Sequence, residues 1–528
     1  MNKKIIGLII SMLVLASAVP TVSSLNNNSM TTMVLYHDQP LTRADWIQIQ
    51  KVLAADGAAY DYFGYSVSLS GDTALIGAIG AENFKGAAYV FTRTGTSWTQ
   101  QAKLLAADGV ASDYFGYSVS LSGDTALIGA MSQNASIGAA YVFTRTGTTW
   151  TPQAKLSAAD GAAGDNFGYS ITLSGDTALI GALGVNSAKG AAYVFTRTGT
   201  TWNQQAKLLA ADGQTPDNLG SSVSLSGDTA LIGASGVSSS KGAAYVFTQA
   251  GSTWTQQAKL LASDGLASDY FGCSVSISGN TAFIGASGAN SGNGSVYVFA
   301  RTGTTWAQQE KLLGASGDGF GCSVSLSGDT ALIGALGDDG AKGSAYVFNL
   351  TGTTWTQQAK LLASDGVPNE YFGNSVSLNG DTALIGAMGD SSAKGAAYIF
   401  INEEPPIPPS IQGPSSGKIK QAYNYTVTST DPNDDNVSYF IDWGDNTTSG
   451  WLGPYASGTT ITQPHTWVKK GTYIIKAKAK DSYGNESGWG TMTVSMPLSY
   501  ESPHFQFFEW LCHRFPHAFP MLRYFLGY

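Results

Sequence analysis

Histidine, cysteine and charge are scarce in this chain, and each scarcity excludes a class of function. Of the 528 residues only 5 are histidine, and none lies between Lys51 and Phe400. A histidine-based triad or a histidine-ligated metal is therefore excluded from that segment. Three cysteines give no disulfide framework. Charged residues make up 12% of the chain, the formal net charge is −9, and no basic patch occurs, which argues against nucleic acid as a partner.

Long apolar runs are also rare. One extends from Ile5 to Leu15, with lysines before it and Ala16-Ser17-Ala18 after it, which predicts a signal peptide over residues 1–18 and a secreted or cell-surface protein. Residues 19–42 follow as a linker. The C-terminal tail, residues 498–528, interleaves aromatic and basic side chains, but its apolar runs are far shorter than the roughly 20 residues that span a bilayer. It suits peripheral attachment to a membrane or envelope, or docking against the protein's own domains.

A repeat fills most of the remaining sequence. Seven tryptophans are each followed five residues later by lysine, from Trp46 and Lys51 to Trp355 and Lys360, and successive lysines are 52, 52, 52, 52, 52 and 49 residues apart. A period of this size indicates a repeat architecture. Each period contains four short strand-like segments separated by turns such as Ser70-Gly-Asp-Thr73, and helical periodicity is absent. Four strands in each such period predict one blade of a β-propeller.

The ends of the repeat region set the number of blades. The first strand of the repeat occurs seven times, but the seventh copy of the repeat ends after its third strand, at Phe400. The missing outer strand stands at the other end, where Trp46 to Leu53 precede the first complete copy. We therefore expect an all-β fold over residues 43–402: a seven-bladed propeller closed by an N-terminal strand, which removes the free sheet edges.

Phe63-Gly64, Leu75-Ile-Gly-Ala78 and Gly86-Ala-Ala-Tyr-Val-Phe91 resemble the FG-GAP repeats of the integrin α-subunit propeller, and more closely the bacterial and archaeal extracellular versions. Integrin-type repeats often carry an Asp-rich calcium loop between the first and second strands. Here that hairpin is only Ser-Gly-Asp-Thr, which cannot surround Ca²⁺ with six to eight oxygens. No cofactor is therefore predicted with certainty, and Ca²⁺, if bound, must sit elsewhere.

A second domain follows a proline-rich linker at residues 403–409. Residues 410–497 contain further strand-like segments, and Trp443-Gly-Asp445, His465-Thr-Trp467 and Gly471-Thr-Tyr473 resemble the PKD family of immunoglobulin-like sandwiches. The resemblance implies a spacer or interaction module, in which His465 is structural. The acidic turn that contains Asp431, Asp434 and Asp435 could bind a cation, but the preferred interpretation is a turn whose side chains are solvated.

One face of the propeller is predicted to bind the ligand. The hairpins of the opposite face barely differ between repeats, whereas the loops after the second strand do, and variable loops on a rigid scaffold are where binding residues usually lie. The candidate ligand-binding residues are Glu82, Asn83, Phe84, Asn134, Asn186, Asp338 and Asp339. The repeated tryptophans are interpreted as packing anchors rather than as a sugar-binding stack.

The same face carries repeated acids in pairs five residues apart, beginning with Asp56 and Asp61. The second acid of each pair precedes Phe-Gly, so a ring of carboxylates could hold cations at the channel mouth. The candidate metal ligands are Asp61, Asp113, Asp165, Asp217, Asp269 and Asp318. The alternative is that these acids are turn formers. Cys273 and Cys322 occupy equivalent positions in neighbouring repeats and are interpreted as small buried residues rather than as a disulfide.

Together these features favour a secreted or cell-surface recognition or adhesion protein whose propeller binds an extracellular protein or polysaccharide. A self-associating structural component of the cell envelope is the alternative. A carbohydrate-active enzyme is a third reading, but acids repeated in every blade do not single out a catalytic pair, so we expect no enzyme activity.

Overall fold

The computed structural model describes residues 45–314 and 318–497, together with residues 510 and 514. The predicted signal peptide, the linker at 19–42 and all but two residues of the tail at 498–528 lie outside this part of the chain. Within it, no helix is long and apolar enough to cross a membrane.

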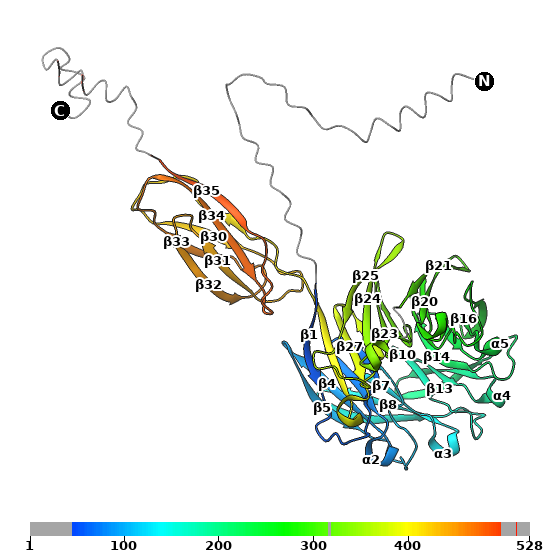
Figure 1. Ribbon diagram of the computed structural model, residues 1–528. Coiled ribbons are helices and arrows are strands. Elements are labelled where there is room, and N and C mark those ends of the chain that lie inside the picture. The colour runs from blue at the N-terminus through cyan, green and yellow to red at the C-terminus, as the bar shows by residue number, and fades with distance from the viewer. Residues whose placement is uncertain (1–44, 315–317, 498–509, 511–513, 515–528) are drawn as a thin grey trace, which may run out of the picture. The chain divides into compact units, whose positions relative to one another are not determined.

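The repeats form seven four-stranded antiparallel sheets, which confirms the predicted blades (Figure 1). The first three sheets contain β2 (Phe63–Ser70), β3 (Thr73–Ala78), β4 (Ala87–Thr94) and β5 (Ser97–Leu104); β6 (Ser118–Ser122), β7 (Thr125–Ala130), β8 (Ala139–Thr146) and β9 (Thr149–Leu156); and β10 (Ser170–Ser174), β11 (Thr177–Ala182), β12 (Ala191–Thr198) and β13 (Thr201–Leu208). The next three contain β14 (Leu219–Ser226), β15 (Thr229–Ala234), β16 (Ala243–Ala250) and β17 (Thr253–Leu260); β18 (Ser274–Ser278), β19 (Thr281–Ala286), β20 (Ser295–Thr302) and β21 (Thr305–Leu313); and β22 (Ser323–Ser327), β23 (Thr330–Ala335), β24 (Ser344–Thr351) and β25 (Thr354–Leu361).

The seventh sheet combines both ends of the repeat region. It contains β26 (Phe372–Asn379), β27 (Thr382–Ala387) and β28 (Ala396–Glu403), and β1 (Asp45–Val52) pairs antiparallel with β28, so that Lys51 lies opposite Tyr398. The N-terminal strand is therefore the outer strand of the last sheet, as the sequence predicts. The first and last sheets are also joined directly, because the backbone N–H of Leu69 donates a hydrogen bond to Ser377 Oγ at 2.9 Å.

Local sequence explains each sheet. Gly71 and its equivalents take positive φ in two-residue hairpins. The second strands are short apolar runs, buried on both faces because each sheet packs between two others. Phe63 is fully buried, and its ring packs edge-on against Tyr89 at 5.5 Å.

The repeated tryptophans hold the outer strands together. Trp150 is 9% exposed, and its Nε1 donates a hydrogen bond to Gln101 Oε1 of the preceding sheet at 2.8 Å. Arg145 lies over its ring at 5.4 Å. The burial agrees with a packing role for these residues.

The second domain is a sandwich of two sheets, in line with the predicted immunoglobulin-like fold. One sheet contains β29 (Ser410–Gln412), β30 (Tyr423–Thr428) and β33 (Ile461–His465), and the other contains β32 (Thr448–Tyr455), β31 (Val437–Asp442), β34 (Gly471–Lys480) and β35 (Gly490–Met496). Trp467 is fully buried between them. His465 stacks on Trp443 at 4.4 Å and pairs with Asp445 at 3.0 Å, which is a structural role.

Candidate functional site

The loops after the second strands are left-handed turns. They are α2 (Ala81–Phe84), α3 (Gln133–Ser136), α4 (Val185–Ala188), α5 (Val237–Ser240), α6 (Ala289–Gly292), α7 (Asp338–Ala341) and α8 (Asp390–Ala393). The two central residues of each turn have positive φ, for example 54° at Glu82 and 59° at Asn83. This conformation costs most L-residues about 1–2 kcal/mol, whereas Gly, Asn and Asp adopt it more readily. The requirement explains the many small polar residues in these variable loops.

These turns also join neighbouring sheets. The carbonyl oxygens of Phe84 and Lys85 accept hydrogen bonds from the backbone N–H groups of Tyr114 (3.1 Å) and Phe115 (2.8 Å) in the next repeat. The same pair of bonds links the seventh sheet to the first, from Tyr62 and Phe63 to residues 393 and 394, both at 2.9 Å. The C-terminal end of each variable loop is therefore fixed to the next sheet by backbone hydrogen bonds.

Six of the seven predicted ligand-binding residues are exposed on these turns: Glu82, Asn83, Phe84, Asn134, Asn186 and Asp339. Phe84 is 37% exposed and packs edge-on against Tyr114 at 5.8 Å. Asp338 differs, because it is 8% exposed and its carboxylate lies 2.5 Å from Lys360 Nζ. Asp338 is therefore an internal ion-pair partner rather than part of the exposed surface.

The first acid of each repeated pair belongs to a Lys–Asp–Tyr group. Asp56 accepts a hydrogen bond from Lys103 Nζ at 2.7 Å and another from the Tyr89 hydroxyl at 2.9 Å. The lysine is the main reason why the pKa of Asp56 lies below its ordinary value. The same group recurs around Asp108, Asp160, Asp212, Asp264 and Asp365. Here the repeated lysine of the sequence pattern has a structural partner.

The second acids, which the sequence marks as candidate metal ligands, close their own loops. Asp61 is 8% exposed, and its Oδ2 accepts a hydrogen bond from the backbone N–H of Ala58 at 2.8 Å. The equivalent bond, at 2.7–2.9 Å, is made by Asp113, Asp165, Asp217 and Asp269. Across residues 45–314 and 318–497, no three acidic, histidine or cysteine side chains are already grouped as a metal site. The geometry of these acids favours the turn-forming interpretation.

The sixth and seventh sheets depart from the repeat. In the sixth, the shorter loop lacks the first acid, and Asp338 takes its place as the partner of the lysine. Asp318, the remaining acid, is 3% exposed, and burial together with the Asp338 carboxylate raises its pKa. In the seventh, Asp390 is added to the group around Lys51. Asp390 was not predicted from the sequence, although Asp338 and Asp390 stand where the other five repeats have Ala, Gln or Val.

The first residues after Phe-Gly line up between neighbouring sheets. The rings of Tyr65, Tyr117 and Tyr169 follow one another with centroids 5.1 Å apart. Cys273 and Cys322 continue this series as free thiols, but both residues are partly exposed rather than buried. Burial raises the pKa of Cys322 to about 11, so its thiol is protonated near neutral pH.

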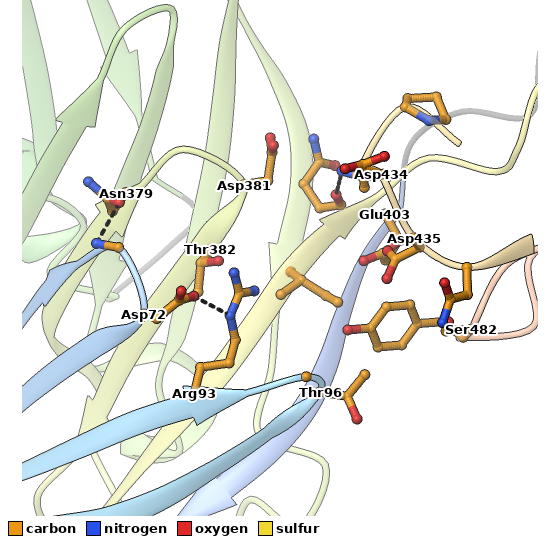
Figure 2. Close-up of a pocket in the computed structure, with 18 residues that line it drawn as sticks. Asp72, Arg93, Thr96, Asn379, Asp381, Thr382, Glu403, Asp434, Asp435 and Ser482 are labelled. Atoms are coloured by element: carbon orange, nitrogen blue, oxygen red, sulfur yellow. Dashed lines mark hydrogen bonds and ion pairs between the residues drawn. The ribbon is translucent and has the colours of Figure 1, made fainter. Parts of the chain in front are cut away.

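A pocket lies where hairpins of the first and last sheets face two loops of the sandwich (Figure 2). Its lining includes the ion pair of Arg93 with Asp72 (2.6 Å) and the acids Glu403 and Asp435. Burial first, and then nearby carboxylates, raise the pKa of Glu403 to about 8 and that of Asp435 to about 6. Beside this pocket Asp431 is 5% exposed, so it is not the solvated turn residue that the sequence suggests.

Comparison with known proteins identifies the repeats. The family model described as FG-GAP repeat matches residues 46–91, 98–143, 150–195, 202–247, 254–299, 306–348 and 355–400. Because these matches cover more than half of the chain, the protein belongs to the FG-GAP repeat family. None of the curated proteins compared with the chain matches it significantly.

Among solved structures, the chain is similar to the PKD domain of an M14-like peptidase from Thermoplasmatales archaeon SCGC AB-540-F20. The two are 53% identical, the match covers 18% of this chain and 99% of that one, and the TM-score is 0.18. FG-GAP propellers and PKD domains are non-catalytic kinds of domain that are typical of extracellular adhesion and recognition proteins.

Proposed function

We propose that this protein is a secreted or cell-surface recognition protein of the integrin α-like, bacterial or archaeal type, and that its propeller binds an extracellular protein or polysaccharide. The ligand contacts the ring of left-handed turns, and the PKD-like domain acts as a spacer. On this view the chain has no enzyme activity, and its tail attaches it to the envelope.

The observation that carries this proposal is the contrast between backbone and side chains in the turns. Seven turns share one backbone conformation and are anchored to the next sheet, yet they present five different exposed pairs, from Glu82 and Asn83 to Asp339 and Gly340. Only the pairs Asn-Ser and Ser-Ser occur twice. A uniform backbone with varied exposed side chains is the arrangement of a recognition surface on a rigid scaffold. Packing alone does not require these differences, because the central side chains point away from the core.

The test uses the full chain in affinity electrophoresis through a panel of polysaccharides and in co-sedimentation with isolated envelope material. The variant Glu82→Gly/Asn83→Gly/Asn134→Gly/Asn186→Gly removes four exposed side chains at positions where glycine keeps the left-handed conformation. The matched control, Thr96→Ala/Thr148→Ala/Thr200→Ala, changes exposed residues in hairpins of the opposite face.

We expect retardation or co-sedimentation that the turn variant weakens at least tenfold and the hairpin control leaves unchanged. Equal binding by both variants would place the ligand elsewhere. Self-association without binding to any polymer or envelope fraction would favour the structural envelope role, and shortening of a polymer would reveal an enzyme.

A further inference from the structure

The second sheet departs from the others in its outer strand. In five other sheets a glutamine of the outer strand accepts a hydrogen bond, at 2.9–3.0 Å, from a backbone N–H of the loop that leads into the same sheet. These glutamines are Gln48, Gln100, Gln204, Gln256 and Gln308. In the second sheet Pro152 of β9 takes this position. The corresponding N–H, that of Ala107, therefore has no acceptor in the part of the chain that the structure describes.

This substitution coincides with a pocket. A cavity of about 410 Å³ lies between the loop at 105–108 and the strands β8 and β9, where the other sheets have the glutamine side chain. Its lining includes Leu105, Asp108, Tyr141, Phe143, Pro152 and Lys155. Proline is tolerated at this place because β9 is the edge strand of its sheet.

The Lys–Asp–Tyr group of the second sheet is more open than its equivalents. The side chain of Lys155 is 35% exposed, whereas the lysines of the five sheets with the glutamine are 22–28% exposed. Tyr141 is 7% exposed, whereas the equivalent tyrosines of those five sheets are fully buried. Lys155 is paired with Asp108 at 2.5 Å. The pocket thus combines a free backbone donor, a neutralised ion pair and an apolar wall.

The other sheets show which chemical group fits the free donor, because there it receives the carbonyl oxygen of an amide. A carboxylate is a poorer match, since Asp108 already neutralises Lys155 and would repel a second anion. An acetamido group presents the same carbonyl oxygen with a methyl group in place of the NH₂. The methyl group gains from burial against Phe143 and Pro152, where an NH₂ group would need an acceptor.

We propose that this pocket binds the acetamido group of an N-acetylhexosamine residue in an extracellular polysaccharide. The acetamido oxygen accepts the N–H of Ala107, and its methyl group packs against Pro152. Sugar hydroxyls bind Asp108 and Lys155, whose ammonium group has three donors. The inference rests on the proposed function for the polysaccharide class of ligand, but it assigns a contact outside the left-handed turns.

The test is calorimetric titration of the full chain with the tetramer of N-acetylglucosamine and with cellotetraose, which has a hydroxyl group in place of each acetamido group. We expect the tetramer to bind at least about tenfold more tightly, the effect of one good hydrogen bond. Pro152→Gln restores the residue of the other sheets, so it should fold, occupy the Ala107 N–H and weaken binding of the tetramer about tenfold. The matched control Thr151→Gln adds the same side chain at the exposed neighbouring position, outside the pocket lining, and should leave binding unchanged.

Three results would overturn the proposal: no binding of the tetramer, equal affinity for cellotetraose, or unchanged binding by the Pro152→Gln variant. Near-ultraviolet circular dichroism checks that both variants fold. Tighter binding of the peptide Gly-Gln-Gly than of the tetramer would assign the pocket to a glutamine of a protein partner and would also overturn it.

Failure of this inference is distinguishable from failure of the proposed function. Envelope binding that the turn variant weakens, without any binding of the tetramer, would refute the acetamido pocket alone. Tetramer binding that Pro152→Gln abolishes, together with envelope binding that the turn variant leaves unchanged, would refute the role of the turns alone.

Discussion

Lys51 Nζ of the N-terminal strand lies 2.5 Å from Asp390 Oδ2 in the seventh sheet. The same ammonium group is 2.7 Å from Asp365 Oδ2, and the Tyr398 hydroxyl lies within hydrogen-bond distance of both carboxylates, at 2.8 Å from Asp365 and 3.0 Å from Asp390. In this sheet alone, no hairpin connects the third and fourth strands, since β1 and β28 come from opposite ends of the repeat region. The additional acid thus reinforces the one sheet whose outer strand could separate.

Replacing Asp390 should loosen this closure. Asp390 is 1% exposed, so Asp390→Ala removes a buried partner of Lys51, and we expect the propeller to lose about 2–4 kcal/mol of unfolding free energy. The control Asp365→Ala removes a half-exposed partner of the same lysine and should cost less than about 1 kcal/mol. Urea denaturation followed by tryptophan fluorescence measures both. Equal losses would show that Asp390 has no special part in closure.

The ion pair of the sixth sheet leads to a similar prediction. Lys360 has no first acid to pair with and uses Asp338, whereas Lys103 in the first sheet has both Asp56 and Glu82. We therefore expect Asp338→Ala to lower the unfolding free energy by about 1–3 kcal/mol, and Glu82→Ala, which leaves the Asp56 pair intact, by less than about 0.5 kcal/mol. Denaturant unfolding of the two variants decides this. A loss from Glu82→Ala as large as that from Asp338→Ala would contradict the assignment.

Much of this architecture could be read from the sequence because its determinants are local. Each sheet is specified by three local signals: the Ser-Gly-Asp-Thr hairpin, the short apolar strand and the fixed tryptophan–lysine spacing. Because these signals recur in each repeat, every copy supports the same prediction. The position of β1 followed from counting strands. The buried tryptophans followed from their place in the outer strand.

The features that could not be predicted from the sequence depend on contacts between residues that lie far apart in the chain. Asp338 looks like an exposed loop residue until one knows that a deletion before β22 leaves Lys360 without its usual partner. The left-handed turns have no periodicity, so their variability indicated a binding surface but not its backbone. The grouping of Glu403 with Asp431 requires the end of the propeller to meet a loop of the next domain, which no local pattern encodes.

The Lys–Asp–Tyr groups predict the response to acid. The lysine hydrogen bonds lower the pKa of Asp56, Asp108, Asp160, Asp212 and Asp264 below their ordinary value of 3.8. Because the folded state binds these protons less readily than the unfolded state, the stabilisation is present above about pH 3.8 and is lost as the pH falls through the lower folded values. Each carboxylate is about half exposed, so each contributes modestly, but five act together.

We accordingly expect the unfolding temperature to fall as the pH drops below about 4. The double variant Asp56→Asn/Asp160→Asn should show a lower unfolding temperature at pH 6 and a shallower fall on acidification. Scanning calorimetry across this range at low salt measures both slopes. An unchanged slope in the double variant would mean that other carboxylates control the acid response.

The left-handed turns predict an unusual order of tolerance at Asn134. Its φ is 53° and its side chain is exposed, so the backbone conformation, rather than any packing, determines which residues fit. Asn134→Gly should change the unfolding free energy by less than about 0.5 kcal/mol, whereas Asn134→Val should cost about 1–2 kcal/mol because a β-branched side chain is strained there. At the exposed hairpin residue Thr148, where φ is not positive, Val should be tolerated. Urea unfolding compares the three variants, and a destabilising glycine at Asn134 would show that the asparagine side chain itself holds the turn.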